Sequence, residues 1–523
     1  TPLEKNTRPC SLNDVLNLKN SMKGLVITPL DKNLGKLAMR RPCLYDNCMQ
    51  KTYDLESNAH HREVHLRPFH NKIMQGTNEN ILHNMIKEQP NAAPGTPKDV
   101  ISHFQAFYKR KGWDKICPFN PHGSLGCMYA ILKDKNCTDP QIRKQKYKKA
   151  RPITPYCKHP MKKLLHYAAR AWMFILKQLK GPHFAIPTTK KFKEKMTDFN
   201  AHFATAKNAR LCTKSWDISG CYTNMPKDKI LESMKEILKL VKADPDIDAL
   251  HEDGTYAEMN SPAIVAKTSK EAINLPKFGK GPAHWGYGDV DTRITLTFKQ
   301  MLDIVSFSLE NAFFILGDKI IQQVHGIPMG DPMSPALCIG SCAYLEMKWF
   351  ESLPANIQPH LKFTRYLDDI FMIANIGQNG IPESDFLALK KEFTENCYPP
   401  CLELEETPHD EYLECKVQTE GNVITTRHWN KNLTHMIATG KQHYYKHQHF
   451  GSHTTNHSKR GALIGTWTRM SDNTSTTEGL HMAICEKMFE LNELKYPKKY
   501  VLKTLKYMHN KTKEEIWSRF ATH

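Results

Sequence analysis

The sequence lacks any apolar run close to the roughly 20 residues that a membrane-spanning helix needs, which excludes a membrane-spanning role. It also lacks internal repeats and low-complexity tracts, so it predicts neither a repeat protein nor a disordered tail. None of the 15 cysteines forms a CxxC pair. The cysteine pairs in CLYDNC (43–48) and CYPPC (397–401) come nearest to that pattern, but their spacing is loose for a zinc site. We therefore expect reduced thiols in an intracellular protein.

What the chain has is length and positive charge. Its 523 residues exceed one ordinary core, so about two to four packed units are expected. Hydrophobic residues make up 40% and aromatic residues 9%, which is enough to bury substantial cores. The 73 Lys and Arg residues outnumber the 54 Asp and Glu residues, giving a formal net charge of +19. This excess favours a polyanionic partner, and nucleic acid before an anionic membrane surface.

Two adjacent aspartates, Asp368 and Asp369, interrupt KFTRYLDDIFMIAN (362–375), a stretch that otherwise predicts a β-hairpin. A third, Asp217, directly follows the predicted strand ARLCTKSW. If that strand lies beside the hairpin, three carboxylates converge on one sheet edge. Oxygen-only ligation suits Mg²⁺, and two such ions lower the pKa of a 3′-hydroxyl and neutralise a leaving pyrophosphate. The alternative is an N-cap aspartate plus a solvated turn, which spacing alone leaves open.

The rest of the chain predicts mixed helices and strands. Apolar residues at helical spacing predict a helix over 227–241, with Asn224 as its N-cap. Residues 242–294 are rich in Gly, Pro, Asp and Asn and predict an inserted loop region. Apolar helices are predicted over 298–315 and 336–353, and the basic, histidine-rich C-terminal hundred residues should be helical near their end.

Three segments in order carry a resemblance. DISGCY at 217–222, MGDPMSP at 329–335 and RYLDDIF at 365–371 resemble palm motifs A, B and C of reverse transcriptases. They most resemble those of the Penelope-like retroelement group, relatives of the telomerase catalytic subunit. Further similar segments extend the resemblance over roughly residues 24–510. It implies an α+β, right-hand polymerase fold of fingers, palm and thumb, with an antiparallel palm sheet backed by helices.

The same resemblance implies a domain division. It gives an N-terminal extension (1–110), fingers (111–200), a palm (201–425, with the insert 242–294), and a thumb with a C-terminal nucleic-acid-binding region (426–523). Many proteins of this group carry a GIY-YIG endonuclease after the thumb, and we expect none here. The resemblance favours a nuclear location, while an organellar, mitochondrial one would suit a basic chain that starts without Met.

The resemblance also assigns site residues. Asp217 and Asp368 would bridge two catalytic Mg²⁺ ions, which Mn²⁺ can replace. Asp369 completes the catalytic set, and Ile218 is added to these three aspartates as a metal ligand. Tyr222 falls where reverse transcriptases place a steric gate against a ribose 2′-hydroxyl, although an ordinary palm-core tyrosine is the alternative.

Other positions match residues that bind the nucleotide and the nucleic acid. Lys133 and Arg151 would clamp the triphosphate, since a point charge and a forked guanidinium suit a polyphosphate. Gly330 lies where the backbone must approach the template–nucleotide pair closely. Asp331 replaces a small residue of many relatives, and the sequence assigns it no role. A mix of cations and aromatics suited to the backbone of an RNA–DNA hybrid is found at Arg427, Trp429, Lys431, Lys459 and Arg460.

Two further groups contain side chains that can bind metals. Cys338 and Cys342 lie one turn apart on the helix predicted over 336–353, and we expect them to pack in the core. The second group suggests either a metal site or a polar nucleic-acid face, and it consists of His443, His447, His449, His453 and His457. No acidic partner accompanies these histidines, which favours the polar face.

These inferences predict an RNA-directed DNA polymerase that adds dNTPs to a primer 3′-hydroxyl, with an RNA template and a DNA primer as partners. One alternative is a catalytically silent, reverse-transcriptase-derived scaffold that binds RNA within a ribonucleoprotein. Three mutually repelling acids argue against it. The other is an RNA-dependent RNA polymerase, which Tyr222 disfavours because such enzymes usually carry a second aspartate at that place.

Overall fold

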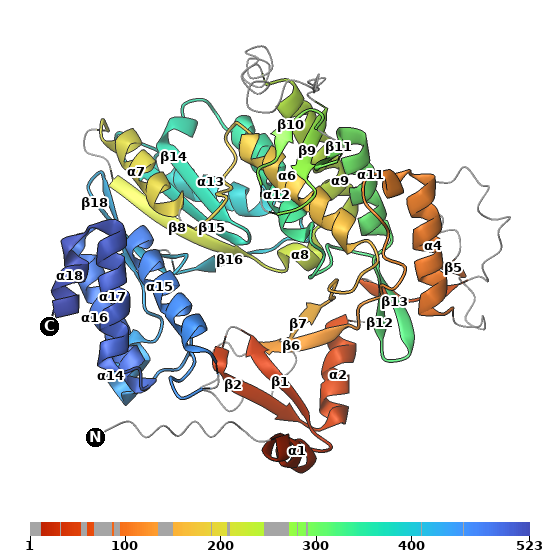
Figure 1. The fold of residues 1–523 in the computed structure, drawn as a ribbon. Coiled ribbons are helices and arrows are strands. Elements are labelled where there is room, and N and C mark those ends of the chain that lie inside the picture. The colour runs from red at the N-terminus through yellow and green to blue at the C-terminus, as the bar shows by residue number, and fades with distance from the viewer. Residues whose placement is uncertain are drawn as a thin grey trace.

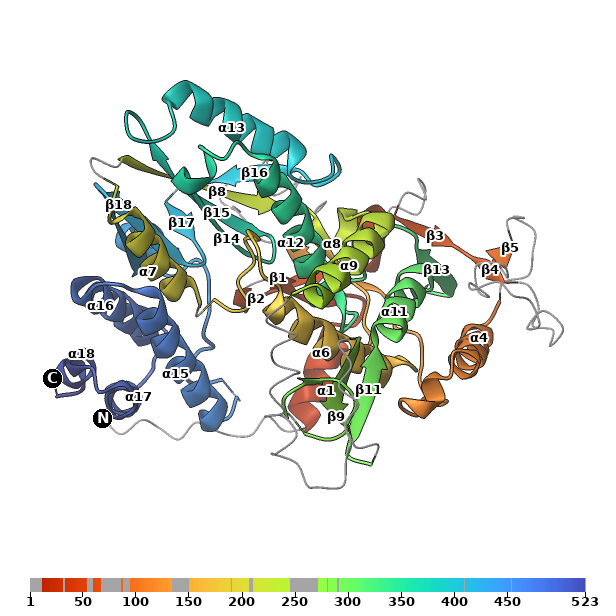
Figure 2. The same ribbon diagram turned by 90° about the horizontal axis from the view of Figure 1, so that it is seen from above.

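The computed structural model describes residues 12–31, 33–53, 60–66, 86–87, 95–133, 150–189, 191–206, 210–244, 271–279, 281–288, 291–408, 410–452 and 454–522. Helices and mostly antiparallel sheets surround three clusters of buried apolar side chains. The C-terminal helices lie at one side of the molecule and α4 (Pro97–Arg110) at the opposite side, in both views (Figures 1 and 2). No helix within the described ranges is long and apolar enough to cross a bilayer.

The central sheet has four strands in the order β14-β15-β8-β16, and all its pairs are antiparallel. Its strands are β8 (Arg210–Ile218), β14 (Leu361–Tyr366), β15 (Asp369–Ile376) and β16 (Leu404–Thr407). Alternate residues of β15 point to opposite faces. Ile370 and Met372 join the main core, whereas Phe371 and Ile373 join a second core.

Helices back both faces of this sheet. The main core contains residues of α9 (Lys227–Lys242), α12 (Ser334–Ser352) and α13 (Glu383–Asn396), and the second core contains residues of α7 (Lys191–Phe203). The predicted α+β palm, an antiparallel sheet backed by helices, is confirmed. The helix predicted over 227–241 is also confirmed. Its N-cap is Pro226, however, because Asn224 is the last residue of the short helix α8 (Cys221–Asn224).

A second sheet joins the N-terminal part of the chain to the predicted fingers, in the order β2-β1-β6-β7. It consists of β1 (Val26–Asp31), β2 (Asn33–Arg40), β6 (Tyr129–Lys133) and β7 (Ala150–Ile153). The hydroxyl of Tyr53, at the end of α2 (Pro42–Tyr53), donates to the Tyr129 carbonyl at 2.7 Å. Residue 110 therefore does not separate two independent sheets.

The loop prediction for 242–294 is wrong in its second half. There β9 (Ala272–Pro276), β10 (His284–Trp285) and β11 (Arg293–Thr297) form a three-stranded sheet in the order β10-β9-β11. The turn-forming residues around these short apolar strands led to the loop prediction. Strand side chains such as Ile273 and Leu275 are fully buried in the main core. Residues 245–270 lie outside the described ranges.

The helix predicted over 298–315 is shorter than expected. α11 (Phe298–Glu310) ends before β12 (Phe313–Leu316), which pairs with β13 (Lys319–Gln323), and β13 in turn pairs with β3 (His61–Glu63). The other elements before residue 180 are α1 (Leu12–Ser21), β4 (His65–Leu66), β5 (Ile86–Lys87), the 3₁₀ turn Trp113–Lys115 and α6 (Lys162–Gln178).

The C-terminal region has its own core. It begins after the central sheet, whose strand β14 is preceded by the 3₁₀ turn Gln358–His360. Four short elements lead into its four helices: β17 (Glu411–Tyr412), β18 (Cys415–Glu420), β19 (Val423–His428) and α14 (Leu433–Thr439). The four helices are α15 (Asn456–Asn473), α16 (Thr477–Glu493), α17 (Lys498–Thr512) and α18 (Glu515–Thr522). Their buried side chains, Trp467 and Trp517 among them, form a cluster separate from the main core.

Candidate active site

The palm register brings the three predicted carboxylates to one end of the sheet. Asp369, the first residue of β15, lies directly opposite Asp217 of β8. Asp368 occupies the turn before it, and its carbonyl accepts a hydrogen bond from the Ile218 N–H at 2.8 Å. On the other side of β8, Glu405 of β16 also lies opposite Asp217. Residues directly opposite each other point to the same face, so Asp369, Asp217 and Glu405 form one acidic row.

Sequence reasoning missed Glu405, because the strand LEET is short and polar. Ile218, a predicted metal ligand, has a buried side chain, and its N–H is bonded to Asp368. Only its main-chain carbonyl oxygen could therefore bind a metal.

The tip of the motif C hairpin is held by three successive carbonyl groups. The Leu367 carbonyl accepts a hydrogen bond from Arg365 Nη1 at 2.8 Å, and the Asp368 carbonyl accepts one from Ile218. The Asp369 carbonyl accepts one from the hydroxyl of Tyr412, on β17, at 3.2 Å. Leu367 itself has φ 57°, a conformation that is uncommon for a bulky residue and needs this support.

Arg365 and Glu346 form a fully buried ion pair beneath this tip. Besides its contact with Leu367, the Arg365 fork donates to both Glu346 carboxylate oxygens and to the Ile339 carbonyl at 3.2 Å. Glu346 also accepts hydrogen bonds from the Tyr398 hydroxyl at 2.7 Å and the Phe184 N–H at 2.9 Å. The pair thus ties the motif B helix to the motif C hairpin. A lone glutamate within the segment AYLEMKWF marks the position in the sequence, but its partner could not be identified there.

The loop before the motif B helix, which contains Gly326 and Gly330, contacts both motif A and the end of strand β7. The Ile327 N–H donates to the Tyr222 carbonyl at 2.6 Å, and a Cβ at Gly326 would lie 2.2 Å from the Thr223 carbonyl oxygen. At Gly330, whose φ is +144°, a Cβ would lie 2.2 Å from the carbonyl oxygen of Thr154. This close approach within the chain itself requires a glycine at 330. A role of Gly330 in nucleotide binding stays a prediction.

Tyr222 lies half-buried on α8, directly after Cys221. Burial raises the pKa of its hydroxyl well above the ordinary value, and the nearby Cys338, Cys221 and Asp368 add to this effect. The phenol therefore stays neutral, close to one of the predicted catalytic carboxylates.

Asp331 acquires a structural role. Its carboxylate accepts hydrogen bonds from the Ser308 hydroxyl on α11 and from the Met333 N–H at 2.7 Å. Burial raises the pKa of this carboxyl from 3.8 to about 6. The residue thus fastens the motif B loop and the start of α12 to α11.

The two predicted triphosphate-binding residues lie on neighbouring strands of the fingers sheet. Arg151 on β7 pairs with Ile131 of β6, and Lys133 lies two residues further along β6. The Thr154 N–H, just after β7, donates to the Met329 carbonyl at 3.1 Å. A main-chain hydrogen bond therefore joins the end of strand β7 to the motif B loop.

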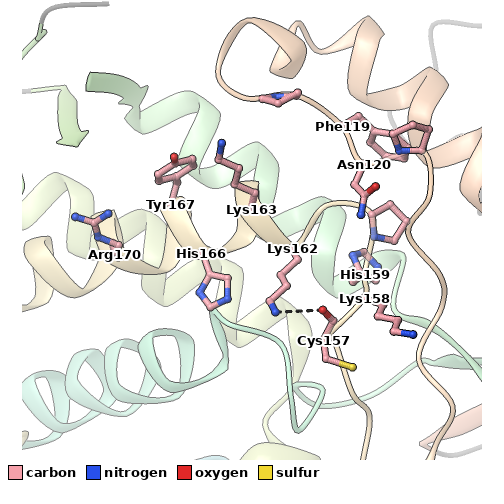
Figure 3. A pocket seen from close by; sticks show the side chains of 13 residues that line it. Phe119, Asn120, Cys157, Lys158, His159, Lys162, Lys163, His166, Tyr167 and Arg170 are labelled. Atoms are coloured by element: carbon pink, nitrogen blue, oxygen red, sulfur yellow. Dashed lines mark hydrogen bonds between the residues drawn. The ribbon is translucent and has the colours of Figure 1, made fainter. Parts of the chain in front are cut away.

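A cavity of about 620 Å³ lies beside α6 (Figure 3). Its lining includes Lys158, Lys162, Lys163, His166 and Arg170. Part of this positive charge is structural. The Lys162 ammonium donates to the Cys157 carbonyl at 3.1 Å, as Figure 3 shows, and Arg170 donates to the Gly281 carbonyl at 2.9 Å. The exposed side chains of Lys158 and Lys163 give the cavity a cationic rim, whereas burial and the nearby Lys162 lower the pKa of His166.

The predicted nucleic-acid-binding residues differ in exposure. Lys431 and Arg460 are exposed. Arg427 is half-buried, lines a second cavity of about 340 Å³ and lies 4.0 Å from Glu486. The Trp429 ring stacks under the Lys416 ammonium, 4.4 Å from the ring centroid.

The prediction for Lys459 is wrong. Lys459 is only 4% exposed, and its ammonium donates to the Phe450 and Ser452 carbonyls at 2.6 and 2.7 Å. It closes a loop within the thumb and is not available to a nucleic acid. A basic composition could not separate it from its exposed neighbour Arg460.

The histidine group does not assemble into a metal site in the part of the chain that the structure describes. His447 is buried beside the Thr466 hydroxyl, while the exposed His449 accepts a hydrogen bond from the Gly451 N–H. His453 lies outside the described residues. Within those residues, the one group of three ligand atoms that lie within 4.8 Å of one another consists of cysteines.

Solved structures of telomerase are similar to this chain. One is telomerase from Candida albicans in a complex with the TWJ fragment of telomeric RNA. The match covers 97% of this chain and 68% of the telomerase chain, with a TM-score of 0.51 and 10% sequence identity. Another is telomerase from Candida tropicalis with the same kind of RNA fragment. That match covers 96% of this chain and 66% of the telomerase chain, with a TM-score of 0.47 and 10% sequence identity. No family model matches the chain, and no curated protein matches its sequence. At this identity the first likeness shows the fold alone: the chain has a right-hand, nucleic-acid polymerase fold.

Proposed function

We propose that the chain is an RNA-directed DNA polymerase, a reverse transcriptase of the Penelope-like group, which extends a DNA primer on an RNA template. The observation that supports this most strongly is the palm register. It puts Asp217 opposite Asp369, and Asp368 next to Ile218, on a sheet of the polymerase type. This is where motifs A and C of the resembled proteins would meet.

The donor set at this sheet edge fits Mg²⁺. It consists of carboxylates on a half-buried edge, and hard divalent cations prefer oxygen ligands. Among the described residues, the oxygen atoms of these acids do not all lie within 4.8 Å of one another, so bound ions would have to draw the side chains together. Asp217 and Asp368 would bind both ions, with Asp369 and the Ile218 carbonyl as further ligands. Bound there, the ions would lower the pKa of the primer 3′-hydroxyl and neutralise the leaving pyrophosphate.

The other residues act by position. The hydrogen bonds from Arg365, Ile218 and Tyr412 to the hairpin tip hold the carboxylates in place before substrate arrives. Tyr222 would exclude a ribose 2′-hydroxyl, and Lys133 and Arg151 would hold the triphosphate. Gly330 keeps the motif B loop against the fingers strand beside that nucleotide.

The partners follow from charge and from the likeness. A net charge of +19 suits a polyanion, and the C. albicans telomerase bound telomeric RNA. Arg427, Trp429, Lys431 and Arg460 would contact the RNA–DNA hybrid. The resemblance favours the nucleus, with a mitochondrial location as the alternative, and imaging of a tagged chain would separate the two.

Primer extension on an oligonucleotide-annealed RNA template tests the function. With Mg²⁺, we expect extension with dNTPs and not with NTPs, and none by Asp368→Ala. Tyr222→Ala should gain NTP incorporation, since it removes the steric gate. Extension with NTPs by the unaltered protein would instead identify an RNA-dependent RNA polymerase. A folded, RNA-binding protein that extends nothing would identify a scaffold.

A further inference from the structure

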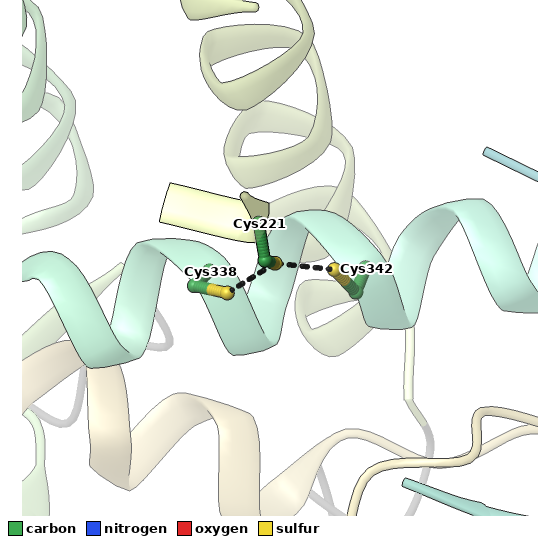
Figure 4. Close-up of side chains that lie close together, drawn as sticks. All are labelled: Cys221, Cys338 and Cys342. Carbon is green, nitrogen blue, oxygen red and sulfur yellow. Dashed lines mark hydrogen bonds between the residues drawn. The ribbon is translucent and has the colours of Figure 1, made fainter. Parts of the chain in front are cut away.

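Three buried cysteines gather behind the candidate active site. Cys221 is the first residue of α8, and Cys338 and Cys342 lie one turn apart on α12 (Figure 4). Their exposed fractions are 3%, 0% and 0%. The sequence predicts core packing for Cys338 and Cys342, and their burial agrees with it. It gave no sign that Cys221, 117 residues before Cys338, would join them.

The sulfur separations match a thiolate metal site. The Cys221 sulfur lies 3.0 Å from that of Cys338 and 3.9 Å from that of Cys342, and all three lie within 4.8 Å of one another. A disulfide would need about 2.05 Å. Three thiolates around one ion with metal–sulfur bonds of about 2.3 Å would be about 3.8–4.0 Å apart. The Cys221–Cys342 separation already agrees with that value, and the Cys221–Cys338 separation would have to widen by about 0.8–1.0 Å, so one ion fits among the three sulfurs after small side-chain movements.

The three cysteines lie together in the main apolar core, and sulfur ligands select soft ions. Figure 4 shows all three side chains pointing toward one another between the two helices. Arg365 donates to the carbonyl of Ile339, next to Cys338 in the chain, so its guanidinium, which is paired with Glu346, lies close by. Hydrogen bonds with Cys221 and Cys338 lower the pKa of the Cys342 thiol, whereas hydrogen bonds within the cluster and burial raise the pKa values of Cys221 and Cys338, so an ion that binds all three must displace the protons of these two thiols.

The number of ligands narrows the choice of metal. Among the described residues, no His, Asp, Glu or fourth Cys joins the group. Structural Zn²⁺ almost always has four ligands, whereas thiolates also select Cu⁺. Cu⁺ is stable with three sulfur ligands in a trigonal arrangement.

We propose that Cys221, Cys338 and Cys342 form a three-thiolate site for a soft metal ion of the Cu⁺ type. The ion ties α8 to α12. Because Asp217 and Tyr222 flank Cys221 in the chain, the ion fixes motif A against the helix behind it. The site is enclosed, so it is loaded as the chain folds. It is independent of the polymerase chemistry, and its metal is distinct from the Mg²⁺ proposed at the sheet edge.

Metal analysis of the full chain tests the site. The protein would be produced in medium supplemented with copper or with cadmium, a soft ion whose thiolate complexes absorb in the ultraviolet. We expect about one copper or cadmium ion per chain, a thiolate-to-cadmium absorption band, and an X-ray absorption shell of three sulfur atoms. Cys342→Ala should lose the metal and the band. Cys415→Ala, which alters a buried cysteine in another core, should keep both.

The unaltered protein decides the outcome even if Cys342→Ala fails to fold. Absence of bound copper and cadmium, or a metal shell of nitrogen or oxygen atoms, would overturn the proposal. So would a Cys415→Ala protein that loses the metal as fully as Cys342→Ala. Primer extension is not part of this readout, so the failure of one proposal does not decide the other.

Discussion

The motif C end of the palm and the basic C-terminal region both contain buried cations, yet the sequence predicts the first region far better than the second. In the palm, three ordered motifs fixed which segments meet, and the register brought their acids together. In the C-terminal region, only a mix of basic and aromatic residues was available. One of its predicted surface cations, Lys459, is buried. Ordered motifs carry positional information, whereas composition does not separate a surface cation from a structural one.

The C-terminal region also neutralises several of its own charges. Glu414 accepts hydrogen bonds from Lys446 at 2.9 Å and from Arg469 at 3.3 Å. Burial opposes ionisation of this carboxyl, but these cations lower its pKa to about 2. Lys487 and Glu490 form a further buried pair. The positive surface left for a nucleic acid is therefore smaller than the sequence indicates.

The largest expected effect separates the buried palm pair from an exposed one. Arg365→Met leaves Glu346 buried without its partner and should lower the free energy of unfolding by about 3–5 kcal/mol. Arg210→Met is the matched control, because its pair with Glu383 has side chains 69% and 63% exposed, and its cost should stay below about 1 kcal/mol. Chemical denaturation measures both. Equal losses would show that the Arg365 pair has no special role.

A double variant sharpens the same comparison. Arg365→Met with Glu346→Leu removes both buried charges and should recover most of the stability that Arg365→Met loses. It should not recover polymerase activity, since the Leu367 carbonyl still lacks its donor. Full recovery of primer extension would contradict the positioning role of Arg365.

A second pair of variants compares neighbours in the thumb. Arg460→Met should weaken binding to an RNA–DNA hybrid and reduce the slope of log affinity against log salt by about 1. Lys459→Met should leave that slope unchanged and lower the melting temperature, because it removes two loop hydrogen bonds. Fluorescence anisotropy at several salt concentrations and thermal melting give both readouts. A reduced salt slope for Lys459→Met would restore it to the binding surface.

The smallest effect concerns the pH dependence at Asp331. Its pKa is about 6 in the folded protein and near 3.8 when exposed, so the folded state resists ionisation and stability falls as pH rises between these values. Asp331→Asn does not titrate. Relative to the unaltered protein, it should therefore gain about 1 kcal/mol between pH 5 and pH 7.5. Urea denaturation at the two pH values measures the difference, and a constant difference would exclude the raised pKa.

Local patterns predicted the elements that depend on few distant contacts. The motif C hairpin and the helix after motif A follow from spacing within one segment, whereas the helices that back the palm sheet were implied by the resemblance. The strands near Ile273 were missed because turn formers surround them and their burial comes from distant helices.

Apart from the meeting of motifs A and C, the contacts between distant segments could not be predicted. The Arg365–Glu346 pair joins a strand to a separate helix, and the pairing of Glu405 with Asp217 depends on the fourth strand of the sheet. Asp331 departs from the usual motif B pattern, and its partner Ser308 lies on another helix. Each of these contacts needs the register and the packing of the whole palm.

The most direct test of the central claim is Mg²⁺-dependent incorporation of a single dNTP by three isosteric variants. Asp217→Asn and Asp368→Asn should each lower the rate by about 10³-fold, which corresponds to about 4 kcal/mol of barrier. Asp318→Asn, the same change at an exposed turn, should stay within about twofold of the unaltered protein. Incorporation by Asp217→Asn or Asp368→Asn at the rate of Asp318→Asn would contradict a catalytic site at this end of the palm sheet.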